Sequence, residues 1–292
     1  MKQQYLYIAS IVALLITACN EDIDLKLNSS ARRLVVESFI TTDTMRQSVR
    51  LTFSGDYFNN QPMPAVTGAA VILRADGDEL SLTEDNQHPG YYFTPDDFFG
   101  KQGVTYQLLV NNVDANNDGT PETYQAESTM PLRFPGDSIQ IGFQKNWNLW
   151  KVMLFANDPA NVENYYAFSV SRNDSLLTSK ISDYEQADDE FFDGNDIDGV
   201  WVFGLKNNDE QYKLRKGDKV TLDVMNINET FFDYLNAIDT ETSSRNPLFS
   251  GAPANVPGNI SNGALGIFTT YAISSLSTIN TKTKEEWLKE LE

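Results

Sequence analysis

Few of the side chains that perform common catalytic chemistry occur in this 292-residue sequence. It contains one histidine, His88, and one cysteine, Cys19. His88 lies in a segment rich in Asp, Asn, Pro and Gly, which is the composition of an exposed turn. A Ser-His-Asp triad would have to use this histidine, and a metal site with two histidine ligands is impossible. The sequence therefore excludes most of the common hydrolase chemistries and predicts a protein that is not an enzyme.

Carboxylates are the most abundant remaining reactive groups. The chain has 41 Asp and Glu residues and a formal net charge of -19, so no single acidic pair stands out. Glycoside hydrolysis needs two carboxyl groups at a set separation, which a sequence does not supply. So acidic a surface repels phosphate backbones, and nucleic acid is not an expected partner. Trp147, Trp150 and Trp201 could stack on sugars, although strand tryptophans more often fill a core or an edge.

One short segment has the ligand spacing of a calcium loop. Asp114, Asn116 and Asp118 place side-chain oxygens at the first, third and fifth positions, and a glycine follows. The twelfth position holds Gln125 instead of a bidentate glutamate, and Glu122 at the ninth position could replace it in part. The flanking segments have strand patterns, whereas the calcium motif has helices. A plain turn between two strands is the alternative, so the only cofactor considered is Ca²⁺.

Short strands dominate the first half of the chain. Period-two alternation and β-branched or aromatic residues predict strands over residues 34–41, 48–54, 69–74, 79–84, 91–94, 103–110 and 123–129. The dipeptide Asp76-Gly77 predicts a tight hairpin turn between the third and fourth of these. Such a series of short strands within about 100 residues indicates an immunoglobulin-like β-sandwich over residues 33–130.

The second half is also predicted to be rich in strands. Two prolines and a glycine mark residues 131–137 as a linker, and residues 138–280 as a second β-rich domain. Its strands are predicted over residues 138–144, 150–156, 164–171, 200–206, 219–225 and 264–274, and a further one could occupy 175–181. Residues 183–199 are acidic without a clear period, which predicts an exposed loop. The predicted fold class is therefore mainly all-β.

Two helices interrupt this pattern. Residues 228–239 place Phe231 and Leu235 on one stripe, and Asn228 can cap the first turn, so this helix is expected to pack on a sheet. The tail, residues 281–292, has Thr283 and Glu286 at the spacing of a capping box. A helix this short is marginal alone, so it either docks or frays.

Residues 1–18 have the charged start, short apolar run and small final residues of a secretory signal peptide. The apolar run is too short for a permanent span, which needs about 20 residues. An apolar residue, two small residues and Cys19 resemble the lipobox of bacterial lipoproteins, whose cysteine carries lipid. An ordinary free cysteine is the alternative, but the chain's one cysteine falls where a lipobox requires it. Residues 19–32 are then a lipidated acidic tether.

Glu21, Asp22 and Asp24 follow this cysteine at once. They resemble the acidic signal that sends lipoproteins of Bacteroidota-type bacteria to the outer face of the outer membrane. A solvated tether that happens to be acidic is the alternative. The predicted location is the outer membrane, through several acyl chains such as palmitate, with the protein facing the cell exterior.

Four stretches resemble the domain of unknown function 4249 family, lipoproteins of Bacteroidota-type bacteria. They are the lipobox with its acidic residues, the strand at 34–37, the segment 128–131 and a late signature within 246–268. The residues of the late signature singled out as a binding loop are Asn246, Pro247, Phe249, Asn255 and Asn259. A loop that only covers a sheet edge is the alternative. The resemblance covers nearly the whole mature chain.

The resemblance implies an outer-membrane lipoprotein, often encoded near TonB-dependent receptors, with no established chemistry. The first hypothesis is a non-enzymatic ligand-binding or accessory subunit of a TonB-dependent transporter system, with the β-barrel receptor as its partner. A carboxylate-based hydrolase of extracellular glycans is the second hypothesis. The third is a structural or adhesion spacer.

Overall fold

The computed structural model describes residues 32–55, 61–190, 193–242 and 254–290. The N-terminal half contains β1 (Leu34–Thr41), β2 (Ser48–Phe53), β3 (Ala70–Ala75), β4 (Asp78–Ser81), β5 (Thr83–Glu84), β6 (Tyr91–Phe93), β7 (Thr105–Val113) and β8 (Glu122–Thr129). The C-terminal half contains β9 (Gly136–Gln144), β10 (Leu149–Asn157), β11 (Tyr165–Arg172), β12 (Ser175–Leu176), β13 (Glu185–Asp188), β14 (Asp196–Lys206), β15 (Lys219–Ile227) and β16 (Leu265–Ile279). The helices are the 3-10 turn η1 (Ile181–Asp183), α2 (Glu229–Thr242) and α3 (Lys284–Glu290). The predicted class, mainly all-β, is confirmed.

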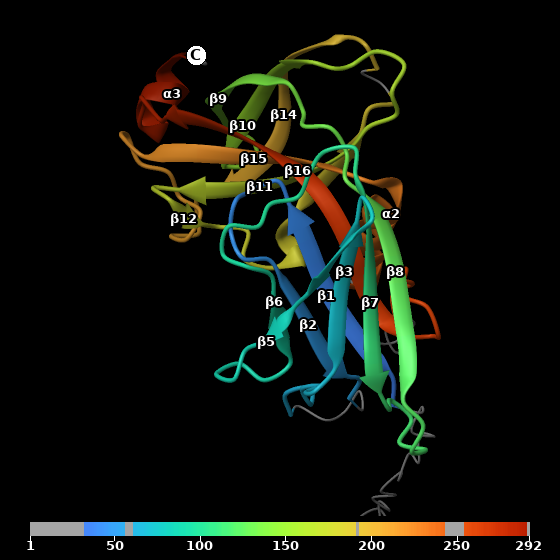
Figure 1. Cartoon of the computed structure of the whole chain (residues 1–292). Coiled ribbons are helices and arrows are strands. Elements are labelled where there is room, and N and C mark those ends of the chain that lie inside the picture. The colour runs from blue at the N-terminus through green and yellow to red at the C-terminus, as the bar shows by residue number, and fades with distance from the viewer. Residues whose placement is uncertain (1–31, 56–60, 191–192, 243–253, 291–292) are drawn as a thin grey trace, which may run out of the picture. The chain divides into compact units, whose positions relative to one another are not determined.

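The strands form three sheets (Figure 1). The largest has nine strands in the order β12-β11-β15-β16-β1-β2-β6-β5, with β13 beside β11. A four-stranded sheet, β4-β3-β7-β8, shares an apolar core with the β1-β2-β6 end of the largest sheet. A three-stranded sheet, β14-β10-β9, shares a second core with its β11-β15 end. The described residues therefore form two β-sandwiches built on one shared sheet.

The first sandwich follows the period-two pattern of its sequence. Leu34, Val36 and Ile40 of β1 alternate toward the core and are fully buried. Strands β3 and β4 meet at Asp76 and Gly77, which both have positive φ, 53° and 86°. A two-residue hairpin of this kind matches the right-handed twist of its strands. The predicted hairpin is confirmed, and so is a β-sandwich in the first half, although β16 from the C-terminal half takes part in its sheet and core.

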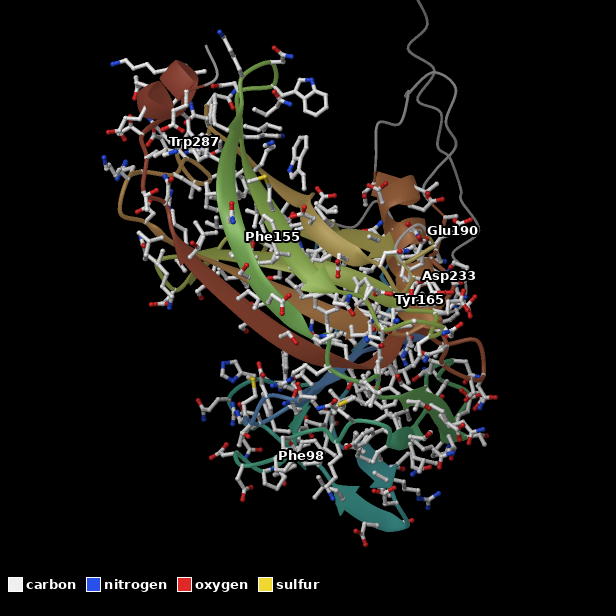
Figure 2. All side chains as sticks on the ribbon, turned by 90° about the horizontal axis from the view of Figure 1, so that it is seen from above. Phe98, Phe155, Tyr165, Glu190, Asp233 and Trp287 are labelled. Carbon is white, nitrogen blue, oxygen red and sulfur yellow. The ribbon has the colours of Figure 1, made fainter. Side chains whose placement is uncertain are left out.

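The second sandwich has Trp150 at its centre. This side chain is 1% exposed, and its ring meets Phe143 edge-on at a centroid distance of 5.0 Å. Trp150 is therefore core filler rather than a surface for ligands. Trp287 and Leu288 of α3 pack against the same core, and Figure 2 shows Trp287 on this terminal helix.

The terminal helix begins with its predicted cap. The Glu286 N–H donates to Thr283 Oγ1 at 3.2 Å, and the Thr283 N–H donates back to Glu286 Oε2 at 2.8 Å. These reciprocal bonds satisfy two backbone donors that the helix leaves open. The capping box predicted from the sequence is therefore confirmed.

Helix α2 covers the remaining face of the shared sheet. Phe231 and Leu235 are buried against Ile267 and Tyr271 of β16. Asn228 caps the helix as predicted, because the Phe231 N–H donates to its Oδ1 at 2.9 Å. In the described part of the chain, no helix is long and apolar enough to span a bilayer.

Strands β1 and β16 pair in parallel, from Val35 opposite Leu265 to Thr41 opposite Tyr271. Gly266 has a φ of +91°, and a Cβ at this position would lie 1.9 Å from the carbonyl oxygen of Val36. A Cβ at Gly258 would lie 1.7 Å from the carbonyl oxygen of Gly266. Only glycine allows this approach of three backbone segments.

The segment between the two sandwiches is bonded to the shared sheet. Asn226 Nδ2 donates to the Leu132 carbonyl at 2.9 Å, and Ser274 Oγ donates to the Phe134 carbonyl at 2.6 Å. Both donors are buried residues of β15 and β16. Whether residues on either side of 131–137 fold as separate domains stays a prediction.

Three details of the second half differ from the sequence prediction. The expected loop over 183–199 contains β13 and the start of β14, so this expectation is wrong in part. β13 is an edge strand bonded to β11, and an edge strand tolerates the acidic composition that concealed it. The strand expected over 175–181 is reduced to β12, and β16 extends past residue 274 to Ile279.

Gly266→Ala is expected to lower the free energy of unfolding by about 3 kcal/mol or more, because it adds a backbone clash to positive-φ strain. Gly263→Ala is the matched control: its φ is also positive, at +67°, but nothing lies within 4 Å of an added Cβ. The free energy of unfolding of Gly263→Ala should fall by only about 1 kcal/mol. Urea unfolding of the two variants measures the difference, and equal losses would contradict the close approach.

Candidate functional site

Several residues singled out in the sequence lie outside the described residues. The lipidation and export residues in this group are Cys19, Glu21, Asp22 and Asp24. The binding-loop residues in this group are Asn246, Pro247 and Phe249. Their predicted roles stay predictions.

The candidate calcium loop directs its oxygens toward its own backbone. Asp114 accepts from the N–H groups of Asp118 and Gly119 at 3.1 and 2.8 Å. The Thr120 N–H donates to Asp118 and is the main cause that lowers the pKa of this carboxyl. Glu122, the proposed substitute ligand, instead accepts a hydrogen bond from the Tyr124 hydroxyl. These bonds make a well-formed turn, and calcium binding here stays a prediction.

Asn255 and Asn259, the two binding-loop residues that the structure describes, differ in their surroundings. Asn255 is exposed. Asn259 acts as an extra piece of strand beside β16: the Phe268 N–H donates to its Oδ1 at 3.0 Å, and its Nδ2 donates to the Phe268 carbonyl at 2.8 Å. The Asn259 amide is therefore committed to the fold, and ligand binding by this loop stays a prediction.

A cluster of three carboxylates lies at the base of the acidic stretch. Asp158, Asp189 and Asp193 each place one oxygen within 4.8 Å of the others, an arrangement that could hold a cation among the described residues. Asp158 is 1% exposed and Asp189 is 4% exposed. Burial, and then the charges of the other two acids, raise the pKa of Asp158.

Protein groups already engage this acidic cluster. The Tyr166 hydroxyl donates to Asp158 Oδ1 at 2.6 Å, and the Asn164 N–H donates to Asp189 Oδ2 at 2.8 Å. The Asn161 N–H donates to Asp193 at 2.6 Å. These bonds connect the segment 158–164 to Asp189 and Asp193, so the cluster already has a structural role. Figure 2 shows Glu190 and Tyr165 on this side of the molecule.

The outward face of the three-stranded sheet has a different character. Trp150, Val152 and Leu154 of β10 point into the core, so the alternate residues point away from it. The outward residues of β10 are Leu149, Lys151, Met153 and Phe155, and two tryptophans, Trp147 and Trp201, lie beside them. We call these six residues the outer aromatic face. Trp147 is 64% exposed, and the other members are half-buried.

The two tryptophans form a pair. Their ring centroids are 5.4 Å apart and the planes are inclined by 39°. The indole N–H of Trp201 donates to the Phe203 carbonyl at 2.7 Å, which fixes the orientation of this ring. The inner tryptophan thus supports the outer one, which leaves Trp147 open to ligands.

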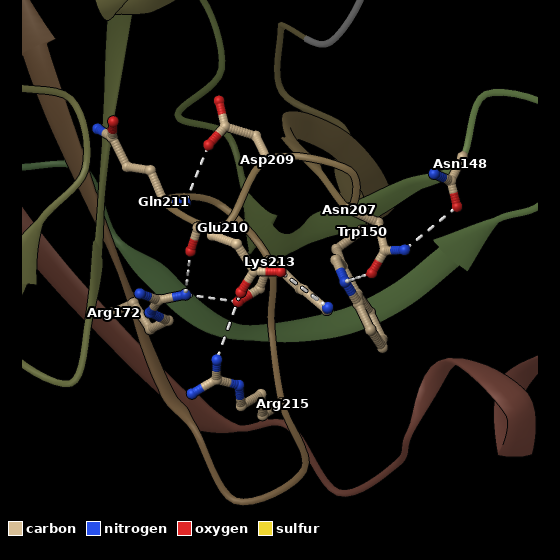
Figure 3. A network of polar contacts seen from close by, with 9 residues as sticks. All are labelled: Asn148, Trp150, Arg172, Asn207, Asp209, Glu210, Gln211, Lys213 and Arg215. Carbon is tan, nitrogen blue, oxygen red and sulfur yellow. Dashed lines mark hydrogen bonds and ion pairs between the residues drawn. The ribbon is translucent and has the colours of Figure 1, made fainter.

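A half-buried network holds the turn that carries Trp147. Figure 3 shows the Trp150 indole N–H donating to Asn207 Oδ1 at 3.1 Å, and Asn207 Nδ2 donating to Asn148 Oδ1 at 3.3 Å. Lys284 Nζ donates to the same Asn148 oxygen at 2.8 Å. Asn148 takes a positive φ of 53°, a conformation that Asn tolerates. The exposed tryptophan therefore stands on a turn fixed to the core and to α3.

A cleft of about 350 Å³ follows the edge strand β14. Tyr184, Tyr212, Gly204 and Lys206 are among its lining residues. Burial raises the pKa of both tyrosines, so their hydroxyls stay protonated at neutral pH. The cleft shares the edge of β14 with the outer aromatic face.

Sequence reasoning named Trp147 and Trp201 as possible stacking residues but could not place them together. It also missed the supporting Asn148 and Asn207, whose only signal is their position in turns. The glycine at 204, beneath the Trp201 ring, is a local sign that an aromatic side chain could lie flat on a strand.

The fold and these surfaces define a mainly β protein whose outer sheet presents an exposed aromatic face. The family described as "Domain of unknown function (DUF4249)" matches residues 20–277, and the chain belongs to this family. No curated protein matches the chain.

The buried acidic cluster predicts an unusual response to pH. Because the folded-state pKa of Asp158 is raised above 3.8, acidification toward pH 4 removes a buried charge and favours the native state. Asp158→Asn lacks this titration, so wild type should gain stability relative to the variant as the pH falls from 7 to 4. Urea unfolding at both pH values measures this gain, with the exposed Asp198→Asn as control. If the free energies of unfolding of wild type and Asp158→Asn differ by the same amount at both pH values, the prediction is contradicted.

Proposed function

We propose that this protein is a lipid-anchored outer-membrane lipoprotein that faces the cell exterior. In this proposal it binds a ligand, without catalysis, as an accessory subunit of a TonB-dependent transporter system. The exposed Trp147, whose ring packs at a tilt against the oriented Trp201, is the observation that supports binding most strongly. A large apolar ring held in water on a rigid turn is typical of a recognition surface.

The membrane part of the proposal rests on the N-terminal sequence. Cys19 occupies the lipobox position, and Glu21, Asp22 and Asp24 follow it. Several acyl chains make attachment durable, because each buried CH₂ contributes about 0.8 kcal/mol. The transporter part rests on the family, whose resemblance implies TonB-dependent receptors in the same genetic setting. Family membership supports this role by association only, since the family's function is not established.

Cys19→Ser is expected to release the protein from the outer-membrane fraction, because it removes the sulfur that carries the lipid. A triple variant, Glu21→Gln with Asp22→Asn and Asp24→Asn, should stay in the membrane but become protected from protease added to intact cells. Fractionation and protease accessibility, read with an antibody, separate the two effects. If wild type is fully protected on intact cells, the exterior location is wrong.

The transporter role has its own test. Wild-type protein extracted in a mild detergent should co-purify with a TonB-dependent receptor. Trp147→Ala reports whether the outer aromatic face takes part, and Phe99→Ala, another large exposed aromatic (48%), is the matched control. Failure of wild type to co-purify with any such receptor would remove the transporter part of the proposal.

A further inference from the structure

We propose that the outer aromatic face binds a glycan whose sugar rings carry carboxylate groups. This inference rests on the proposed ligand-binding function and names the class of ligand. It depends on three features of one surface: flat rings, a row of neutral polar side chains, and lysines without acidic partners.

Two aromatic rings of this face, those of Trp201 and Phe155, pack over glycines of β14. A Cβ at Gly204 would be 3.3 Å from the Trp201 ring, and one at Gly199 would be 3.1 Å from the Phe155 ring. Because glycine has no side chain, these rings can approach the strand backbone closely. A pyranose presents a patch of C–H groups on its flat face, which is complementary to an exposed aromatic ring.

Polar side chains run beside this apolar row. On β9, Ser138 pairs with Phe155, Gln140 with Met153, and Gln144 with Leu149. Cross-strand partners point to the same side of a sheet, so a hydroxyl and two amides border the aromatic row. Amides and hydroxyls both donate and accept hydrogen bonds, as recognition of sugar hydroxyls requires.

At the tryptophan end of this face the charged strand residues are lysines, whereas Asp198 lies opposite Phe155 at the other end. Lys151 lies opposite Gly204, the glycine beneath Trp201, and Lys206 lies opposite Leu149. Lys145 and Lys284 flank the turn that carries Trp147. Within the described residues, none of these four ammonium groups has a carboxylate within 4.0 Å, although other lysines of the chain are paired. In a chain of net charge -19, this local excess favours an anionic ligand.

These features favour a charged glycan over a neutral one or an apolar peptide. A neutral glycan would gain nothing from the unpaired lysines. An apolar peptide would leave the amides of β9 and the lysines without partners, which opposes burial of such a face. A carboxylate-bearing glycan satisfies all three sets of groups, with its ring on the tryptophans and its acid group near Lys151 or Lys206.

Binding of polygalacturonate oligomers to the full chain in detergent, followed by calorimetry, tests the inference, with dextran as the neutral comparison. Wild type should bind polygalacturonate, with affinity that falls as salt rises. Trp147→Ala should weaken binding by about tenfold or more, because the stacking ring is lost. Phe99→Ala should have no effect. Because Trp147 is largely exposed, the variant should unfold at the same temperature as wild type.

The lysines have a separate readout. Lys151→Ala with Lys206→Ala should weaken polygalacturonate binding and flatten its salt dependence, whereas Lys101→Ala should do neither. Equal binding of dextran and polygalacturonate would overturn the charge argument. No binding of polygalacturonate, or unchanged binding by Trp147→Ala, would overturn the inference as a whole.

The outcomes also separate this inference from the transporter role. If polygalacturonate does not bind but Trp147→Ala abolishes receptor co-purification, the face is a protein interface: the glycan inference is overturned and the transporter role stands. If polygalacturonate binds as expected and wild type co-purifies with no receptor, the inference stands and the transporter role fails.

Discussion

The parallel pairing of β1 with β16 is the constraint on which the rest of the structure depends. These strands lie more than 200 residues apart in the sequence, yet they form the middle of the shared sheet. β16 contributes Phe268 to the first core, while Ile267 and Tyr271 pack under α2, and Leu276 packs against the second core. Because Gly266 and Gly258 allow the backbones to meet, one strand connects all three apolar clusters.

This arrangement explains which parts of the fold could be predicted from the sequence. The Asp76-Gly77 hairpin, the Asn228 cap and the terminal capping box depend on neighbours within a few residues, and each is confirmed. The order of strands depends on pairings across the whole chain, for which local patterns carry no signal. The same limit applied to β13, because its acidic residues are acceptable only at an edge next to β11.

The candidate site was predictable to a smaller extent. The sequence indicated that tryptophans could stack on sugars, but only the packing of the second sandwich separates Trp150 in the core from Trp147 in water. The side of the sheet that a tryptophan faces depends on strand register, and β14 has register shifts opposite Met153 and Phe155. A bulge of this kind re-aims side chains in a way that alternation along a single strand does not predict.

The two unusual surfaces of the second sandwich use charge in opposite ways. At the acidic cluster, burial raises the pKa of Asp158, because its charge raises the free energy of the native state. On the outer aromatic face, Lys206 is exposed to water, where an unpaired ammonium group has little energetic cost. A charge that is solvated and unpaired is available to a ligand, whereas a buried and bonded one is committed to the fold. By this criterion, the aromatic face is the surface that we propose for recognition, and the bonds of the acidic cluster belong to the scaffold that supports it.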